Sequence, residues 1–346
     1  MDNVIISFPI FGDGFAFNPS RSFSVFGYSI YWYGVIIACG FLLAVAYAFR
    51  RSKQFGVTDN NIIDMLIFAV PSAIICARIY YVIFNPADYF GPGKWINIIK
   101  IWNGGLAFYG VAIGAFAAVC IFCKVKKISI GAMLDIGGLG FLIGQSVGRW
   151  ANLINREAFG GETSLPWKMG LTDALGETIY VHPTFLYESL WNALGFVLLH
   201  LYSKKHRKYD GQIFLLYIAW YGFGRYMIEG LRSDSLYLFN TDIRVSQLLA
   251  LLSFAVAVVF LLRNRLNKKH TPENLFANKV IVAADMASVE KLDEYDIDKI
   301  LSMGTEDNTK TDDVSDLPQD DGAAPTDNTA STETENNIEE PDNLSS

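Results

Sequence analysis

Arginine residues recur at the edges of long apolar segments of the chain. They are Arg78, Arg149, Arg156, Arg225, Arg232 and Arg244. The planar guanidinium group can hold a phosphate through two parallel hydrogen bonds, which a lysine cannot do. The alternative is that they pair with carboxylates and join helices, as the four-residue spacing of Arg225 and Glu229 allows. Taken together, the arginines favour a site for a phosphate group.

A polar stretch at residues 148–161, GRWANLINREAFGG, adds further candidates. The asparagine amides of Asn152 and Asn155 can donate to or accept from a phosphate or a glycerol hydroxyl. Glu157 supplies a carboxylate, and Gly160 with its neighbouring glycine permits a tight backbone turn. These groups are of the types that would hold a polar headgroup beside the arginines.

A second stretch, HPTFLYE at residues 182–188, contains a histidine that could move a proton. Pro183 is suited to the first position of a helix, which places His182 at the edge of the following apolar segment. An isolated histidine at such an edge is more often structural than catalytic. Its closeness to the arginines makes His182 a candidate general base, with a purely structural role as the alternative.

Seven apolar segments must position these side chains. Residues 30–49 and 105–123 contain no charged residue, and each is long enough to cross a hydrocarbon core of ~30 Å as a helix. The seven segments are 30–49, 62–84, 105–123, 128–147, 184–203, 212–231 and 243–262. We therefore expect an all-α integral membrane protein with seven transmembrane helices.

Basic residues cluster after alternate segments and indicate the orientation. Lysines and arginines follow the first, third, fifth and seventh segments, in residues 50–53, 124–127, 204–208 and 263–269. The positive-inside rule places these ends in the cytoplasm. The N-terminus is then extracytoplasmic and the C-terminus cytoplasmic. The arginine group and the long link at about 148–181 lie on the extracytoplasmic side.

The net charge of −7 hides two different regions. Residues 271–346 contain 20 acidic and 4 basic residues, which leaves 15 acidic and 24 basic residues in 1–270. The acidic region is rich in polar residues and nearly lacks aromatic ones, so it cannot bury enough apolar surface to fold by itself. We expect a catalytic membrane domain over 1–270 and a disordered cytoplasmic tail over 271–346.

The motifs resemble those of the prolipoprotein diacylglyceryl transferases. That family's pattern G-R-x-G-N-x-x-N-x-E-x-x-G is matched from Gly148 to Gly160, with Ala151 in place of the second glycine. Its H-P-[ST]-x-L-Y-E matches residues 182–188, and its Y-G-x-x-R-x-x-x-E-x-x-R begins at Tyr221. The W-Y-G at 32–34 and the A-R-x-x-Y-V at 77–82 also match, so the resemblance covers about residues 20–265.

The resemblance implies transfer of the diacylglyceryl group of phosphatidylglycerol to the lipobox cysteine of a prolipoprotein signal peptide. It implies a multi-pass protein of the bacterial cytoplasmic membrane that binds membrane lipid and no nucleic acid. The expected catalytic residues are Arg149, Arg225, Glu157 and His182. The expected substrate-binding residues are Arg149, Asn152, Asn155, Tyr33, Arg78, Gly105, Gly160, Tyr187, Glu188, Glu229 and Arg232. Two fixed arginines would stabilise the negative charge that develops on the leaving phosphate.

One position departs from some members of that family, which carry a histidine before the Gly-Gly-Leu of residues 104–106. This chain has Asn103 there, and an asparagine cannot act as a general base. We expect no cofactor, because no cluster has metal-ligand spacing and no glycine-rich nucleotide loop is present. A transporter or flippase for an anionic solute is the alternative function, although related halves with broken helices are not evident.

Overall fold

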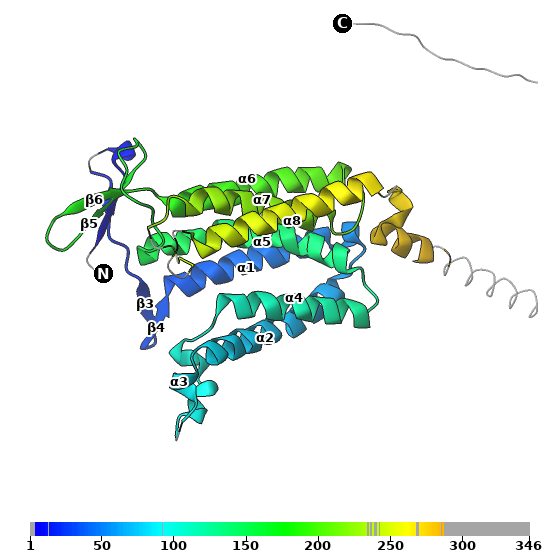
Figure 1. Cartoon of the computed structure of the whole chain (residues 1–346), viewed down its shortest axis with the longest axis horizontal. Helices are drawn as coiled ribbons and strands as arrows, with labels where there is room; N and C mark the ends of the chain where they lie inside the picture. Colours follow the sequence, from blue (N-terminus) through cyan, green and yellow to red (C-terminus); the bar gives the residue numbers. More distant parts are fainter. Residues whose placement is uncertain are drawn as a thin grey trace, which may run out of the picture. The chain divides into compact units, whose positions relative to one another are not determined.

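The computed structural model describes residues 4–12, 14–91, 93–233, 235, 237, 238, 241, 243–267, 270–284 and 286, and these are mostly helical (Figure 1). The long helices are α1 (Trp32–Arg51), α2 (Asp59–Phe84), α4 (Phe108–Val125), α5 (Ile130–Asn155), α6 (Thr184–Lys205), α7 (Gln212–Glu229) and α8 (Val245–Asn267). The short ones are α3 (Pro86–Tyr89) and the 3₁₀ turns η1 (Pro9–Phe11), η2 (Ser52–Phe55), η3 (Trp95–Ile98), η4 (Ile101–Asn103) and η5 (Pro272–Asn274).

Each of the seven apolar segments forms one of the long helices. Five of them, α1, α2, α4, α5 and α8, are long and apolar enough to cross a membrane. The helices α6 and α7 have similar lengths, but they carry the buried charged residues Glu188 and Glu229, as well as Arg225. The coarser prediction of a mostly helical membrane protein is therefore confirmed.

The helix α5 lies among the other helices and contacts α1, α6 and α7 (Figure 1). The core at this centre includes Leu139 and Leu142 of α5 and Ile213 of α7, which are fully buried. Helix α5 runs to Asn155, so the first half of the polar stretch 148–161 is helical and not part of a loop. Arg149, Asn152 and Asn155 are consequently held on a packed helix.

A close contact between glycines and backbone joins α2 and α4. A Cβ atom added at Gly110 would lie 2.6 Å from the Cα atom of Ala77, and one added at Gly114 would lie 2.9 Å from the carbonyl oxygen of Ser72. Small residues four apart let helix backbones approach in lipid, where packing replaces the hydrophobic effect. The two helices therefore form a tight pair, which Figure 1 shows beside α1 and α5.

Two tryptophans join α6 to α7 in a reciprocal arrangement. The indole rings of Trp191 and Trp220 stack with centroids 4.2 Å apart. The Nε1 of each donates to the backbone carbonyl of the other, at 3.0 Å in both directions. Gly195 and Gly224 provide the space, because a Cβ atom at either would lie within 2.5 Å of the opposite indole.

A small sheet at one end of the helices was not predicted, and the expectation of an all-α protein was wrong in this respect. It contains β1 (Ile5–Ser7), β2 (Ala16–Phe17), β5 (Met169–Thr172) and β6 (Thr178–Val181) in the order β2-β1-β5-β6, all antiparallel. Ile6, Met169 and Val181 form its buried face. A separate hairpin of β3 (Ser22–Val25) and β4 (Tyr28–Tyr31) leads into α1. The sheet covers the end of the helices that carries residues 148–161.

The segment after α8 packs back onto the helices. The chain divides into one compact unit over Met1–Ser288 and a second over Val289–Ser346, so the first unit extends past the boundary at residue 270 that the charge distribution suggested. Residues 276–284 are helical, and Ala277 is buried. The expected disorder of the tail concerns residues that lie, beyond position 286, outside the described part of the chain.

We expect deletion of residues 289–346 to change neither the thermal unfolding midpoint nor turnover by more than about 2-fold. Deletion of residues 270–346 should lower the unfolding free energy by about 1–3 kcal/mol, the cost of removing one packed aromatic side chain from the core. That side chain is Phe276, which packs against the main core. Thermal unfolding of both truncated proteins in detergent checks this, and equal midpoints would show that the segment contributes no stability.

Candidate active site

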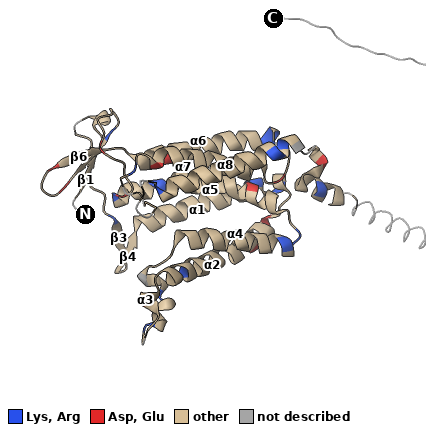
Figure 2. Ribbon diagram, viewed as in Figure 1, with Lys and Arg blue, Asp and Glu red and all other residues tan. Residues whose placement is uncertain are grey.

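Three helices bring charged side chains to the same end of the molecule. Arg149 lies on the last turns of α5, Glu188 on the first turns of α6, and Arg225 on the last turns of α7. Figure 2 shows this mixed group of basic and acidic residues at one end of the helices and mainly basic residues at the other. The antiparallel course of α5, α6 and α7 thus assembles a charged centre from distant parts of the sequence.

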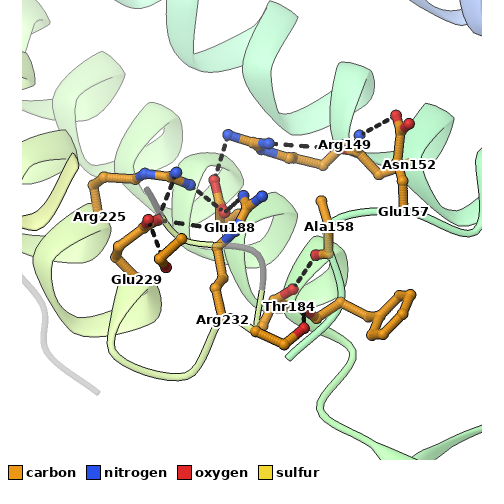
Figure 3. A network of polar contacts seen from close by, with 12 residues as sticks. Arg149, Asn152, Glu157, Ala158, Thr184, Glu188, Arg225, Glu229 and Arg232 are labelled. Carbon is orange, nitrogen blue, oxygen red and sulfur yellow. Dashed lines mark hydrogen bonds and ion pairs between the residues drawn. The ribbon is translucent and has the colours of Figure 1, made fainter. Parts of the chain in front are cut away.

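Glu188 is the carboxylate at which the arginines meet. Its Oε2 lies 2.5 Å from Arg149 Nη2, and its Oε1 lies 2.8 Å from Arg225 Nη1. Arg232 Nη1 lies 3.7 Å from the same Oε1. The side chain of Glu188 is only 5% exposed, so these ion pairs are shielded from water. One buried carboxylate therefore joins α5, α6 and α7 (Figure 3).

Glu229 forms a second carboxylate beside the first. Its Oε2 lies 2.6 Å from Arg225 Nη2 and 3.8 Å from Arg232 Nε. Its Oε1 accepts a hydrogen bond of 2.9 Å from Ser235 Oγ, and Arg244 Nη1 donates to its backbone carbonyl. Arg225 is thereby held by two carboxylates at once, with each end of its guanidinium fixed.

The charges of this centre do not balance. Arg149, Arg225 and Arg232 contribute three positive charges, while Glu188 and Glu229 contribute two negative ones. The side chain of Arg149 is 23% exposed, compared with 15% for Arg225 and 12% for Arg232. The excess positive charge in a largely buried setting attracts an anion, and Arg149 is the arginine most open to one.

A branch of amide and carboxylate groups continues from Arg149. Its Nη1 lies 3.5 Å from Asn152 Oδ1. Asn152 Nδ2 donates to Glu157 Oε1 at 2.9 Å, and Asn155 Nδ2 lies 3.4 Å from the same oxygen. Figure 3 shows Glu157 and Asn152 pointing toward each other beyond Arg149. The structure thus connects both asparagines and Glu157 to the arginine centre.

His182 and Tyr187 belong to a neighbouring chain of contacts. His182 Nδ1 lies 3.3 Å from the hydroxyl of Tyr187, which accepts a hydrogen bond of 2.8 Å from Trp167 Nε1. The backbone of Gly160 pairs with that of Arg232 and donates to the carbonyl of His182 at 2.9 Å. A Cβ atom at Gly160 would lie 2.6 Å from His182 Cβ. Gly160 therefore allows the histidine strand to approach the arginine segment.

Arg78 has a different environment from the other arginines. Its guanidinium donates to backbone carbonyls, with four bonds of 2.6–2.8 Å to Asn97, Ile98, Gly104 and Gly105. It also lies over the ring of Tyr89, 4.9 Å from the centroid. Gly105 is needed here because a Cβ atom would lie 2.4 Å from the guanidinium. This geometry favours a role for Arg78 in holding the link between α2 and α4, rather than in binding a phosphate.

Arg156, another of the edge arginines, also bonds to the backbone. It is 4% exposed and donates to the carbonyls of Val4, Ile154 and Pro19 at 2.8–2.9 Å. These contacts join the end of α5 to the N-terminal segment. The structural alternative that was weighed for each arginine therefore describes Arg156.

Sequence reasoning missed several contributors to the centre. Ser235 and Arg244 support Glu229, and Arg21 Nη2 donates to the carbonyl of Asn155 at 3.2 Å. Arg244 could have been included because it belongs to the same group of edge arginines, whereas nothing in the spacing of Arg21 or Ser235 indicated a contact. Tyr33, which was expected to bind substrate, lies on the first turn of α1 and is 40% exposed.

The fold and the site define a polytopic membrane protein with a buried arginine–carboxylate centre at one end of its helices. The sequence profile described as prolipoprotein diacylglyceryl transferase matches residues 21–263. The chain belongs to this family of transferases.

Proteins with the name phosphatidylglycerol–prolipoprotein diacylglyceryl transferase are similar over most of their length. The protein of Lactiplantibacillus plantarum is 45% identical over 254 residues, which is 71% of this chain and 88% of that protein. That of Oceanobacillus iheyensis is 42% identical over 68% of this chain and 85% of its own length. That of Pediococcus pentosaceus is 40% identical over 77% and 97%, respectively.

Proposed function

We propose that this enzyme transfers the diacylglyceryl group of phosphatidylglycerol to the thiol of the lipobox cysteine in prolipoproteins. The sulfur attacks the glycerol carbon and forms a thioether, while the carbon–oxygen bond to the phosphate breaks. Glycerol phosphate leaves with the bonding electron pair, and the thiol proton passes to a base. The observation that carries the proposal is the excess positive charge of the Arg149–Glu188–Arg225 centre in a chain of this family.

Each part of the centre has a place in this reaction. Arg149 and Arg225 bind the lipid phosphate and stabilise the charge that it gains as it leaves, which is most effective where donors are fixed before the reaction. Glu188, Glu229 and Arg232 hold the two arginines in position. Asn152, Asn155 and Glu157 bind the glycerol hydroxyls or orient Arg149. Tyr33, Tyr187 and Gly160 shape the surroundings of the bound lipid.

The topology fits a site at the outer leaflet of the bacterial cytoplasmic membrane. The basic last turns of α1, α4, α6 and α8 then lie in the cytoplasm, and all seven long helices span the membrane. The arginine centre, at the opposite helix ends, faces the side from which lipoprotein precursors emerge.

Incubation with labelled phosphatidylglycerol and a lipobox peptide tests the proposal. A transferase forms a base-stable thioether between the lipid and the peptide, and it forms none with a peptide in which serine replaces the cysteine. A transporter or flippase, which membership of this family does not favour, would move the lipid without forming this product.

We expect His182→Gln to lower the transfer rate about 10²-fold at pH 7, if His182 accepts the thiol proton. The loss should shrink as the pH rises toward 8.5, near which an ordinary thiol ionises unaided. A pH–rate profile of the variant measures this. His206→Gln, at the opposite end of α6, is the matched control. A loss that is equal at every pH would instead assign His182 a structural role through its contact with Tyr187.

A further inference from the structure

The segment that follows α8 has a fixed place at the basic end of the helices. The ring of His270 stacks on that of Tyr209 with centroids 4.4 Å apart. The backbone amide of Phe276 donates to Asp210 Oδ2 at 3.1 Å. Ala277 packs so closely on the loop between α1 and α2 that a Cβ atom at Gly56 would lie 2.7 Å from its Cα atom. The family profile ends at residue 263, so this segment is an addition to the family's matched region.

The helical residues 276–284 expose apolar side chains beyond this anchor. Val280 is 40% exposed, and Ile281 and Val282 are each 56% exposed. Met286 is 68% exposed. A short helix in water would gain nothing from presenting such side chains, whereas a helix at a membrane surface buries them at the boundary between headgroups and acyl chains.

A cavity of about 440 Å³ lies between this helix and the loop that begins α2. It is lined by Lys53, Gly56, Val57, Thr58, Asp59, Asn60, Ala277, Val280 and Ile281. Asp59 Oδ1 accepts a hydrogen bond of 2.6 Å from Ser52 Oγ, while the exposed ammonium group of Lys53 provides a positive charge. Lys279 adds a second exposed cation on the helix itself. The apolar and cationic groups together match an anionic phospholipid.

We propose that residues 276–286 dock on the membrane leaflet at the basic end of the helices, where Lys53 and Lys279 bind an anionic phospholipid headgroup. The docking surface continues the lipid-facing surface of α8, on which Leu262 is 50% and Leu266 is 79% exposed close to the helix end. Each lysine near an anionic surface contributes a modest attraction. The leaflet is the cytoplasmic one under the orientation proposed above, but the docking does not depend on that orientation.

Photo-crosslinking of the full chain in nanodiscs tests this docking. Benzoylphenylalanine replaces Ile281 in one variant and the exposed polar residue Glu273 of the same segment in the control variant. The discs contain equal amounts of phosphatidylglycerol and phosphatidylcholine in both leaflets, so the result is independent of orientation and of transferase activity. We expect lipid adducts at position 281 to exceed those at 273 about fivefold or more, with phosphatidylglycerol enriched about fivefold over phosphatidylcholine.

The lysine variants provide the charge test. In the Lys53→Ala/Lys279→Ala background, adducts at position 281 should persist while the preference for phosphatidylglycerol falls to about 1. Equal labelling at 281 and 273, or crosslinks from 281 mainly to the acidic tail or to a second copy of the chain, would overturn the proposal. Adducts without a preference for the anionic lipid would overturn it as well. Failure of transfer in the thioether assay would affect only the proposed function.

Discussion

Replacing Arg149 by lysine should lower kcat by about 10²-fold or more while the protein level stays unchanged. The substitution keeps the charge but removes the planar fork that holds a phosphate through two bonds. Removing one fixed donor from a site that stabilises developing negative charge costs about 10²–10³ in rate. Arg149 is also the most exposed of the three arginines around Glu188, which makes it the one most able to contact the lipid.

Steady-state transfer from labelled phosphatidylglycerol to a lipobox peptide measures this loss. The control is Arg50→Lys, a matched substitution of an exposed arginine at the opposite end of the helices, which should leave turnover within about 2-fold. Turnover of the Arg149→Lys protein equal to that of the unmodified protein would exclude Arg149 from the site.

Replacing Glu188 by glutamine should destabilise the protein by about 3 kcal/mol and nearly abolish transfer. The change preserves shape but leaves Arg149 and Arg225 without the buried carboxylate that both contact. Removing one partner of a buried ion pair costs about 3–5 kcal/mol because the other charge stays uncompensated. Unfolding in detergent and the transfer assay measure the two effects.

A double substitution separates charge from packing at this position. If the uncompensated charge is responsible, adding Arg149→Gln to Glu188→Gln should recover part of the stability, so that the two substitutions are not additive. Strictly additive losses would show that Glu188 acts through packing alone. Glu162→Gln, at an exposed glutamate near the sheet, should change stability by no more than about 0.5 kcal/mol.

The long helices could be predicted because hydrocarbon burial leaves a long uniform record in the sequence. The segment expected at 105–123 forms α4 over Phe108–Val125, and the one expected at 184–203 forms α6 over Thr184–Lys205. The arginine–carboxylate centre could be predicted in part, since Arg225 and Glu229 are one helical turn apart and do form an ion pair.

Contacts between distant segments left no such record. The sheet pairs Ile5 with Thr172, and strands of two to four residues are too short to show an alternating pattern. Glu188 was named as a binding residue, but its central place depends on how α5 and α7 approach α6. Arg78 resembled the other arginines in sequence, and only the fold of residues 97–105 shows that its donors bond carbonyls.

The paired indoles between α6 and α7 limit how this region can evolve. Losing Trp191 would leave the Trp220 carbonyl without its donor and Trp220 without its stacking partner, and the reverse substitution would do the same. A side chain at Gly195 or Gly224 would displace an indole. The four positions therefore form one unit of inheritance, in which a first substitution is disfavoured until the others have changed, and related proteins should carry either all four residues or a different solution at all four.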